Sequence, residues 1–203
     1  MKKTLKYIIG IIVLLIVAYN SIYFRKLDEV RASSSGFDAK AYANKYFRSK
    51  LLPSVPNAIE LGQSLMLLQS NKEETFSKYA HALGIGNIRY FLVRGEGQAT
   101  SVNENDVSIL LKADTNQKVI RIATEFVFGN AIRDASGQID INEFKNTMDF
   151  NNVSAEINKI VRAEVLPAFK NNVKKGDTVQ FAGAIELNKE HLNTGDIEVM
   201  PVQ

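Results

Sequence analysis

The stretch around residues 132–144 carries the residue pattern that is closest to a known ion-binding motif. It overlays the calcium loop of an EF-hand, with a glycine and a central isoleucine in place, through four oxygen-bearing side chains: Asp134, Ser136, Asp140 and Glu143. The first ligand position, however, is Ile132, whose side chain has no oxygen, and the segment before it has the composition of a strand. We therefore reject a calcium site. We expect instead that Gly137 forms a turn and that Asn142 caps a short helical turn.

The remaining reactive residue types give no catalytic or metal-binding signature. His81 and His191 lie far apart in the sequence, and there is no cysteine, which excludes disulfides, thiol nucleophiles and thiolate metal sites. Neither a nucleophile elbow nor a phosphate-binding loop is present. We expect no metal, no cofactor and no catalytic residue. A hydrolase remains an alternative, because two carboxylates can be assembled in space without any signature in the sequence.

A long apolar run near the N-terminus determines where the chain is expected to reside. It extends from Tyr7 to Phe24 after a lysine-rich start, and as a helix it covers about 27 Å, close to a hydrocarbon core of about 30 Å. No Ala-x-Ala-like cleavage site follows it. Residues 1–26 are therefore predicted to be an uncleaved signal-anchor in the cytoplasmic membrane, and a cleaved secretion signal is the alternative.

The orientation of this span rests on a weak charge signal. Three basic side chains lie on each side of the run, and the short N-terminal flank adds its own amine. The positive-inside rule then places the N-terminus in the cytoplasm and the body on the extracytoplasmic side.

The charge of the body argues against nucleic acid as a partner. The chain has a formal net charge of +3, but residues 1–31 hold six basic and two acidic side chains, which leaves the remainder at −1. Binding to nucleic acid depends on clustered lysine and arginine that neutralise phosphates. We therefore expect no nucleic-acid partner.

A small, polar stretch at 27–36 is predicted to be a tether, and residues 37–86 are predicted to form a helical cap. Apolar periodicity indicates about three helices, the first from 39 to about 52, stopped by Pro53, the second after Pro56 and the third from Asn71 to about Leu83. Asn71 and Glu74 have the spacing of a capping box. The cap is the natural surface for docking on a membrane complex if a stripe with Tyr42, Tyr46 or Leu65 is exposed.

Residues 87–203 change to the period of two that is typical of strands. Gly95 and Gly97 indicate a bulge or bend in the first strand, and a helix is expected at 152–169. The five predicted strands cover about 88–102, 107–113, 118–128, 178–187 and 196–202. A meander of three strands, a helix and then a hairpin is the order of the OB-fold. The predicted fold class is therefore α+β, with a membrane helix, a helical cap and a five-stranded OB-like β-barrel, cap and barrel forming one compact unit.

The barrel face on the second and third strands, with the loops at 103–106 and 188–195, is the expected binding surface of such a fold. Alternation along the third strand places Arg121 and Glu125 on the outer side and Phe126 and Phe128 on the other. The outer side lacks an aromatic platform, which disfavours single-stranded nucleic acid. Tyr90 is the nearest aromatic for a saccharide, and a tyrosine packed in the core is the alternative.

Several spaced blocks resemble a bacterial family of predicted periplasmic lipoproteins, domain of unknown function family 2291. The similarity extends from about Leu27 to the C-terminus, and the blocks that carry it are 91–97 (Phe-Leu-Val-Arg-Gly-Glu-Gly), 133–135, 139–146, 150–153 and 157–158. The resemblance implies an extracytoplasmic, membrane-tethered protein with no established activity, whose relatives often accompany sugar uptake transporters. Many relatives have a lipobox cysteine, which carries a lipid anchor, and this chain has none. The apolar run would therefore take the place of the lipid as the membrane anchor.

The resemblance also singles out a cluster of polar residues, because polar side chains recur in these blocks: Arg133, Asp134, Asn142, Asn146 and Asn158. They form either a ligand site or a structural set made of a buried Arg–Asp pair and asparagine-to-backbone hydrogen bonds. The function expected overall is that of a non-catalytic accessory or partner-binding module, which the resemblance links to a sugar uptake transporter. A stand-alone binder of a small soluble ligand such as a saccharide is the alternative.

Overall fold

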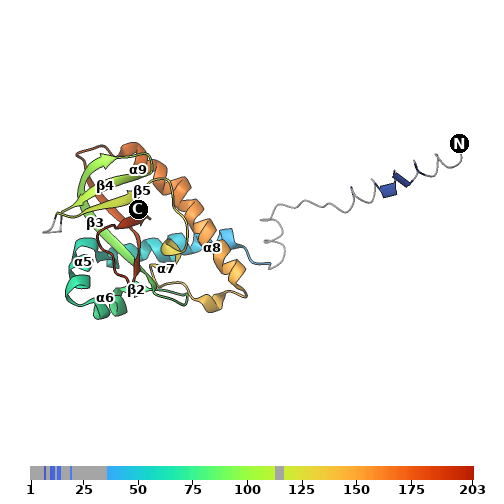
Figure 1. Ribbon diagram of the computed structural model, residues 1–203, viewed down its shortest axis with the longest axis horizontal. Coiled ribbons are helices and arrows are strands. Elements are labelled where there is room, and N and C mark those ends of the chain that lie inside the picture. Colours follow the sequence, from blue (N-terminus) through green and yellow to red (C-terminus); the bar gives the residue numbers. More distant parts are fainter. Residues whose placement is uncertain (1–6, 8–9, 12, 15–18, 20–35, 113–116) are drawn as a thin grey trace. The chain divides into compact units, whose positions relative to one another are not determined.

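The computed structural model describes residues 7, 10, 11, 13, 14, 19, 36–112 and 117–203, and the chain divides into two compact units, Met1–Gly36 and Phe37–Gln203. The predicted membrane span at 7–24 and the tether at 27–36 fall almost entirely outside the described residues. Among the residues that are described, no helix has the length and apolar character needed to cross a membrane. The second unit contains the sheet and all the helices discussed below (Figure 1).

The first helix of this unit begins where the sequence predicts. Helix α3 (Ala39–Tyr46) is capped by Asp38, whose carboxylate accepts a hydrogen bond from the amide of Ala41 at 2.9 Å. It continues through a π-helical turn, Phe47–Leu51, into α4 (Leu52–Ser54) and a 3-10 turn, Val55–Asn57. Pro53 does not stop the helix as expected, because a proline in the first turn of α4 needs no amide donor there.

Two short helices follow, α5 (Leu61–Ser70) and α6 (Lys72–Tyr79). Glu60 caps α5 by accepting a hydrogen bond from the amide of Gln63 at 2.7 Å. The expected capping box of α6 does not form. Instead, the Asn71 side chain donates to the Glu74 carboxylate at 2.6 Å and makes no cap bond to the backbone.

Helix α6 ends earlier than expected because the next residues join the sheet. Ala80–His81 form strand β2, which pairs antiparallel with Phe91 and Tyr90 of strand β3. Strand β1 (Ile59–Glu60) runs parallel to the same strand. The prediction that the third helix reaches Leu83 was therefore wrong.

Five strands form the barrel, and their order confirms the predicted topology. They are β3 (Ile88–Val102), β4 (Asp106–Leu111), β5 (Val119–Ala123), β6 (Thr178–Asn188) and β7 (Glu198–Pro201). They are ordered β3-β4-β5-β7-β6, and a second pairing of β6 with β3 closes the sheet. Only β5 and β7 are parallel among the neighbours of this ring. This closed Greek-key arrangement is the OB-fold.

The two glycines of β3 allow close packing rather than a bulge. The ladder between β3 and β6 runs without interruption from Ile88 to Gln98, and the register shift of β3 against β4 falls later, between Ala99 and Ser101. A Cβ atom on Gly97 would lie 2.3 Å from the carbonyl oxygen of Leu110. The bulge expected at these glycines is therefore absent, and the irregularity of β3 lies between Ala99 and Ser101.

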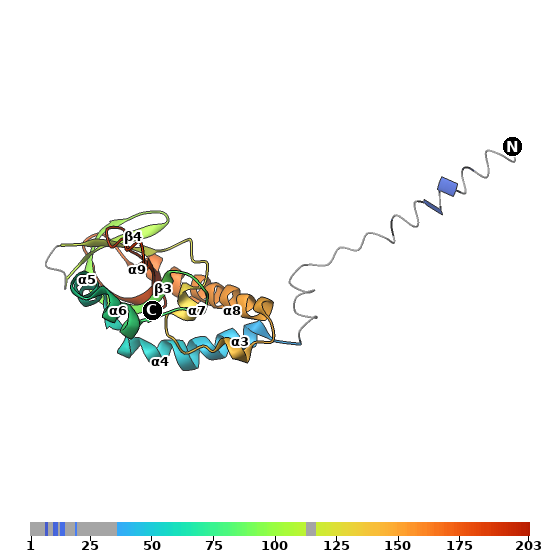
Figure 2. The ribbon, with the colours of Figure 1, turned by 60° about the horizontal axis from the view of Figure 1, so that its bottom comes forward.

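The helix between the third and fourth barrel strands is longer than predicted. It consists of α8 (Thr147–Ile160), a π-helical turn, Val161–Val165, and α9 (Leu166–Asn172). Of the two short elements before it, α7 (Ala131–Asp134) was not predicted. The 3-10 turn, Ile141–Glu143, is the short helical turn expected around Asn142. Figure 2 shows that α3 and α4 run alongside α8 on one side of the barrel.

Two hydrophobic cores hold the unit together. One fills the barrel and includes residues of α5 and α6, such as Leu65 and Phe76, and the other lies between α3, α7, α8 and the outer face of the barrel. Tyr46 and Leu65 are 2% and 3% exposed, and Tyr42 is half-buried. The stripe that would have made the cap a docking surface is thus used for internal packing.

Candidate functional site

The strongest polar cluster is a buried ion pair at the end of α7. Arg133 and Asp134 are each 2% exposed, and Nε and Nη2 of the arginine donate to the two carboxylate oxygens at 2.5 and 3.0 Å. Nη1 donates to the carbonyl oxygen of Phe150 at 3.3 Å, and the guanidinium carbon lies 3.4 Å from the centre of the Phe150 ring. Both charges are therefore satisfied inside the protein.

Tyr46 extends this cluster across to α3. Its hydroxyl donates to the carbonyl oxygen of Arg133 at 2.7 Å and lies 2.6 Å from Oγ of Ser136, which in turn accepts from the amide of Gln138. Because the tyrosine has one proton, Ser136 donates to it. Burial raises the pKa of Tyr46 to about 12. The network fastens α3 to the loop after α7.

The three asparagines of the predicted cluster do not converge on the ion pair. Asn158 donates to the carbonyl oxygen of Gly129 at 2.9 Å, and Asn146 caps α8 by accepting from the amide of Asp149 at 2.8 Å. Asn142 is exposed and is not a cap. Asp140 caps the 3-10 turn instead, because its carboxylate accepts from both the amide and the side chain of Asn142.

The residues of the EF-hand overlay also point to different partners. Asp134 binds Arg133, whereas Glu143 accepts from the hydroxyl of Tyr42 at 2.7 Å and lies 3.6 Å from Nζ of Lys50. Burial, together with Glu143, raises the pKa of Tyr42. Within the ranges that the structure describes, no group of three or more histidine, aspartate or glutamate side chains could hold a metal ion.

The three barrel-face candidates occupy separate places. Tyr90 packs half-buried against the outer core, and burial, with a smaller effect of Glu186, raises its pKa. Arg121 pairs with Asp196 at 2.7 Å. Glu125 lies beyond the end of β5 and pairs with Lys170 of α9 at 3.7 Å. Tyr90 therefore fits the core alternative more closely than an open sugar-stacking platform.

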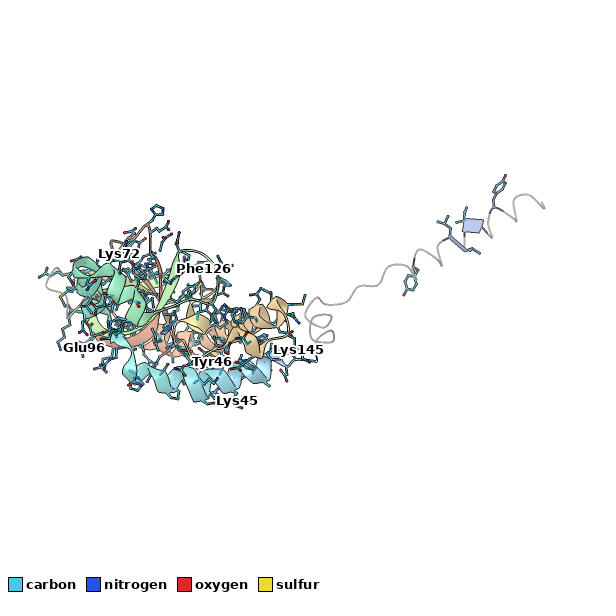
Figure 3. The ribbon with its side chains drawn as sticks, turned by 90° about the horizontal axis from the view of Figure 1, so that it is seen from below. Lys45, Tyr46, Lys72, Glu96, Phe126 and Lys145 are labelled. Carbon is cyan, nitrogen blue, oxygen red and sulfur yellow. The ribbon has the colours of Figure 1, made fainter. Side chains whose placement is uncertain are left out.

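The surface that sequence reasoning missed lies directly after β5. Phe126 and Phe128 are each 58% exposed, with ring centres 6.3 Å apart, and the Arg162 guanidinium carbon lies 5.2 Å from the Phe128 ring centre. We call these three residues the Phe126–Phe128 surface. In Figure 3, Phe126 lies on the side of the body opposite to Lys45 of α3.

The chain leaves the sheet at this point, where α8 and the π-helical turn after it form hydrogen bonds to the next residues. Arg162 donates to the carbonyl oxygen of Val127, whose side chain is fully buried, and Asn158 holds Gly129. The prediction that the third strand continues to 128 was wrong, since alternation of apolar and polar residues cannot distinguish a strand from an extended loop. Residues 124–128 contain no glycine or proline, so the sequence has no breaker that would place the end of the strand at Ala123.

Two hollows among the described residues adjoin the candidate residues. The larger, about 570 Å³, is beside β1 and the middle of β3, and its polar lining is Glu60, Arg94, Glu96, Lys112, Gln180 and Gln203. The smaller, about 310 Å³, lies between the end of β5 and α9 and shares Arg162 with the Phe126–Phe128 surface. The larger volume is in the range of small-molecule sites.

Comparison with known proteins agrees with this architecture. The structure is similar to the crystal structure of an OB-fold protein from Thermotoga maritima, with a TM-score of 0.70 and 29% sequence identity over 83% of this chain and 97% of that chain. No curated protein matches the chain significantly. Residues 12–203 match the model of the predicted periplasmic lipoprotein family, domain of unknown function 2291. The chain therefore belongs to this family.

Proposed function

We propose that this protein is a non-catalytic, membrane-tethered module on the extracytoplasmic side of the cytoplasmic membrane, which binds a partner protein through the Phe126–Phe128 surface. The observation that carries the proposal is the exposure of two neighbouring phenylalanine rings beside a cation. Large aromatics and arginine are the residue types that dominate the energy of protein interfaces. The apolar run at 7–24 would hold the module at the membrane.

The partner should have matching chemistry. The two rings need an apolar groove, and the guanidinium of Arg162, which already donates to Val127, has further donors for an acidic side chain. The relatives that this chain resembles often accompany sugar uptake transporters. The proposed groove is therefore formed by an extracytoplasmic loop of such a transporter. Catalysis is not part of the proposal, because Glu125, Asp134 and Glu143 are each held in a pair or hydrogen bond.

The proposal is tested by the size of the complex that the full chain forms. Mild detergent extracts of native membranes should contain the protein in a species larger than the monomer, together with a transporter subunit. The double variant Phe126→Ser with Phe128→Ser should migrate as the monomer. A matched control replaces Met66 and Met148, which are 44% and 47% exposed elsewhere on the body, with serine and should migrate like the wild type. An unchanged complex in the phenylalanine variant would contradict the proposal.

Binding of a small soluble ligand is the second candidate function. It is favoured by the larger hollow, whose volume of about 570 Å³ is suited to a small molecule. This candidate does not compete with the first, because the hollow and the Phe126–Phe128 surface share no residue.

A further inference from the structure

We propose that the hollow beside β1 and β3 is a binding site for a small, neutral, polyhydroxylated ligand, such as a monosaccharide or a cyclic polyol, held by Glu60 and Arg94. The inference rests on the second candidate function and gives it a site, a ligand class and contact residues. It does not depend on the Phe126–Phe128 surface.

Glu60 supplies the first unmet hydrogen-bonding group. One carboxylate oxygen, Oε2, caps α5, but Oε1 is buried and has no hydrogen-bond partner. It is the only such side-chain atom in the part of the chain that the structure describes. Leaving a buried charged acceptor unpaired is costly, so native proteins rarely do so without a ligand, an ion or a water to supply the donor.

Arg94 supplies the complementary group. It is the direct neighbour of Glu60 in the β1–β3 ladder, yet the two side chains form no ion pair. Nε donates to the carbonyl oxygen of Ala58 at 3.2 Å, and no hydrogen bond of the described residues involves the two Nη groups. Two residues of the lining on adjacent strands therefore carry an unpaired acceptor and a set of unpaired donors.

The other charges of the hollow are already paired. Nζ of Lys112 lies 2.6 Å from Oε1 of Glu96, and the side chain of Gln180 donates to Oε2 of the same carboxylate at 3.0 Å. Among the charged side chains of the lining, Glu60 and Arg94 thus remain unpaired with each other, one of each sign, which suits a neutral ligand. Two neighbouring hydroxyls meet this need, because one can donate to the carboxylate while the other accepts from the guanidinium.

The apolar lining fits a sugar ring. Val55, Phe181 and Ala182 contribute apolar surface beside the polar groups, which matches a ligand with C–H faces and hydroxyl edges. Gly95 lies in the wall, and a Cβ atom there would come within 2.7 Å of the Phe181 ring. A zwitterionic amino acid also carries both signs of charge, but burying its ammonium group costs more than burying a hydroxyl.

The test uses the full-length protein in nanodiscs, titrated with D-glucose, D-ribose and myo-inositol, and separately with L-alanine and L-glutamine. We expect saturable binding of at least one polyol by calorimetry, with shifts in the backbone amide resonances of Gly95 and Glu96 but not of Thr124. Glu60→Gln and Arg94→Ala should weaken binding by at least about tenfold. Two matched controls, Glu125→Gln and Arg121→Ala, should bind like the wild type.

Three results would overturn the proposal: no saturable binding of any polyol up to high millimolar concentration, binding of amino acids alone, or equal weakening by the control variants. The amide shifts keep the site testable if a variant fails to fold, because they are measured on the wild type. A failure here with an intact transporter complex would leave partner binding in place, so the two proposals are separable.

Discussion

At the scale of single residues, two of the polar residues singled out in the sequence form a buried ion pair. Arg133 and Asp134 are buried together, and Tyr46 ties their backbone to α3. From the sequence, these residues were predicted to form either a ligand site or a structural set with a buried Arg–Asp pair. It could not decide between them, because burial is decided by α3 and α8, which pack over the pair from distant parts of the chain.

The buried pair gives the first prediction. Arg133→Ala leaves the Asp134 carboxylate buried without its partner and should lower the free energy of unfolding by about 3–5 kcal/mol. Arg48→Ala removes an exposed pair with Glu164 and should cost less than about 1 kcal/mol. Denaturant unfolding of both variants measures the difference. Equal and small losses would show that the buried pair is not a structural element.

His81 gives a prediction about pH. Burial lowers its pKa below the ordinary value of 6.5, and its ring lies where a side chain on Gly137 would be. As the pH falls below about 6.5, the unfolded chain binds a proton that the folded chain resists, so stability is lost toward acid. Thermal unfolding between pH 7.5 and 5 should therefore show a smaller loss for His81→Gln. Parallel curves for variant and wild type would contradict this.

At the scale of elements, periodicity predicted the features of helices and strands that depend on the local sequence. It failed for features that depend on packing against distant parts of the chain. The strand order of the barrel and the start of α3 follow from alternation and from the cap at Asp38. The end of β5 does not, because Asn158 of α8 and Arg162 of the π-helical turn after it hold the next residues away from the sheet. Exposure of Phe126 was accordingly invisible in the sequence.

The close approach of β3 and β4 gives the prediction at this scale. Gly97→Ala places a Cβ atom 2.3 Å from the Leu110 carbonyl oxygen, so the strands must separate. The expected loss in the free energy of unfolding is about 1–3 kcal/mol. Gly84→Ala is the control, since nothing lies within 4 Å of its added Cβ. Similar stability of the two variants would refute the close-packing role.

At the scale of the whole molecule, membership of the family and the OB-fold describe the body, and the mode of attachment to the membrane stays a prediction. If residues 7–24 form the anchor, alkaline carbonate should leave the full chain in the membrane pellet, and the mature protein should keep its N-terminal residues by mass spectrometry. A version exported with a cleavable signal in place of residues 1–36 should be released. A natural mature N-terminus near Ser21 or later would contradict the anchor.

The Phe126–Phe128 surface is the proposed docking surface, and the most direct test is whether it lies next to a transporter subunit in the native membrane. A photo-cross-linking amino acid replaces Phe126 in the full chain, and in a matched control it replaces Lys45, which is exposed on the opposite side of the body (Figure 3). Illumination should give one discrete adduct with a transporter subunit from position 126 and none from position 45. The absence of an adduct at 126, or the same adduct from both positions, would contradict the account.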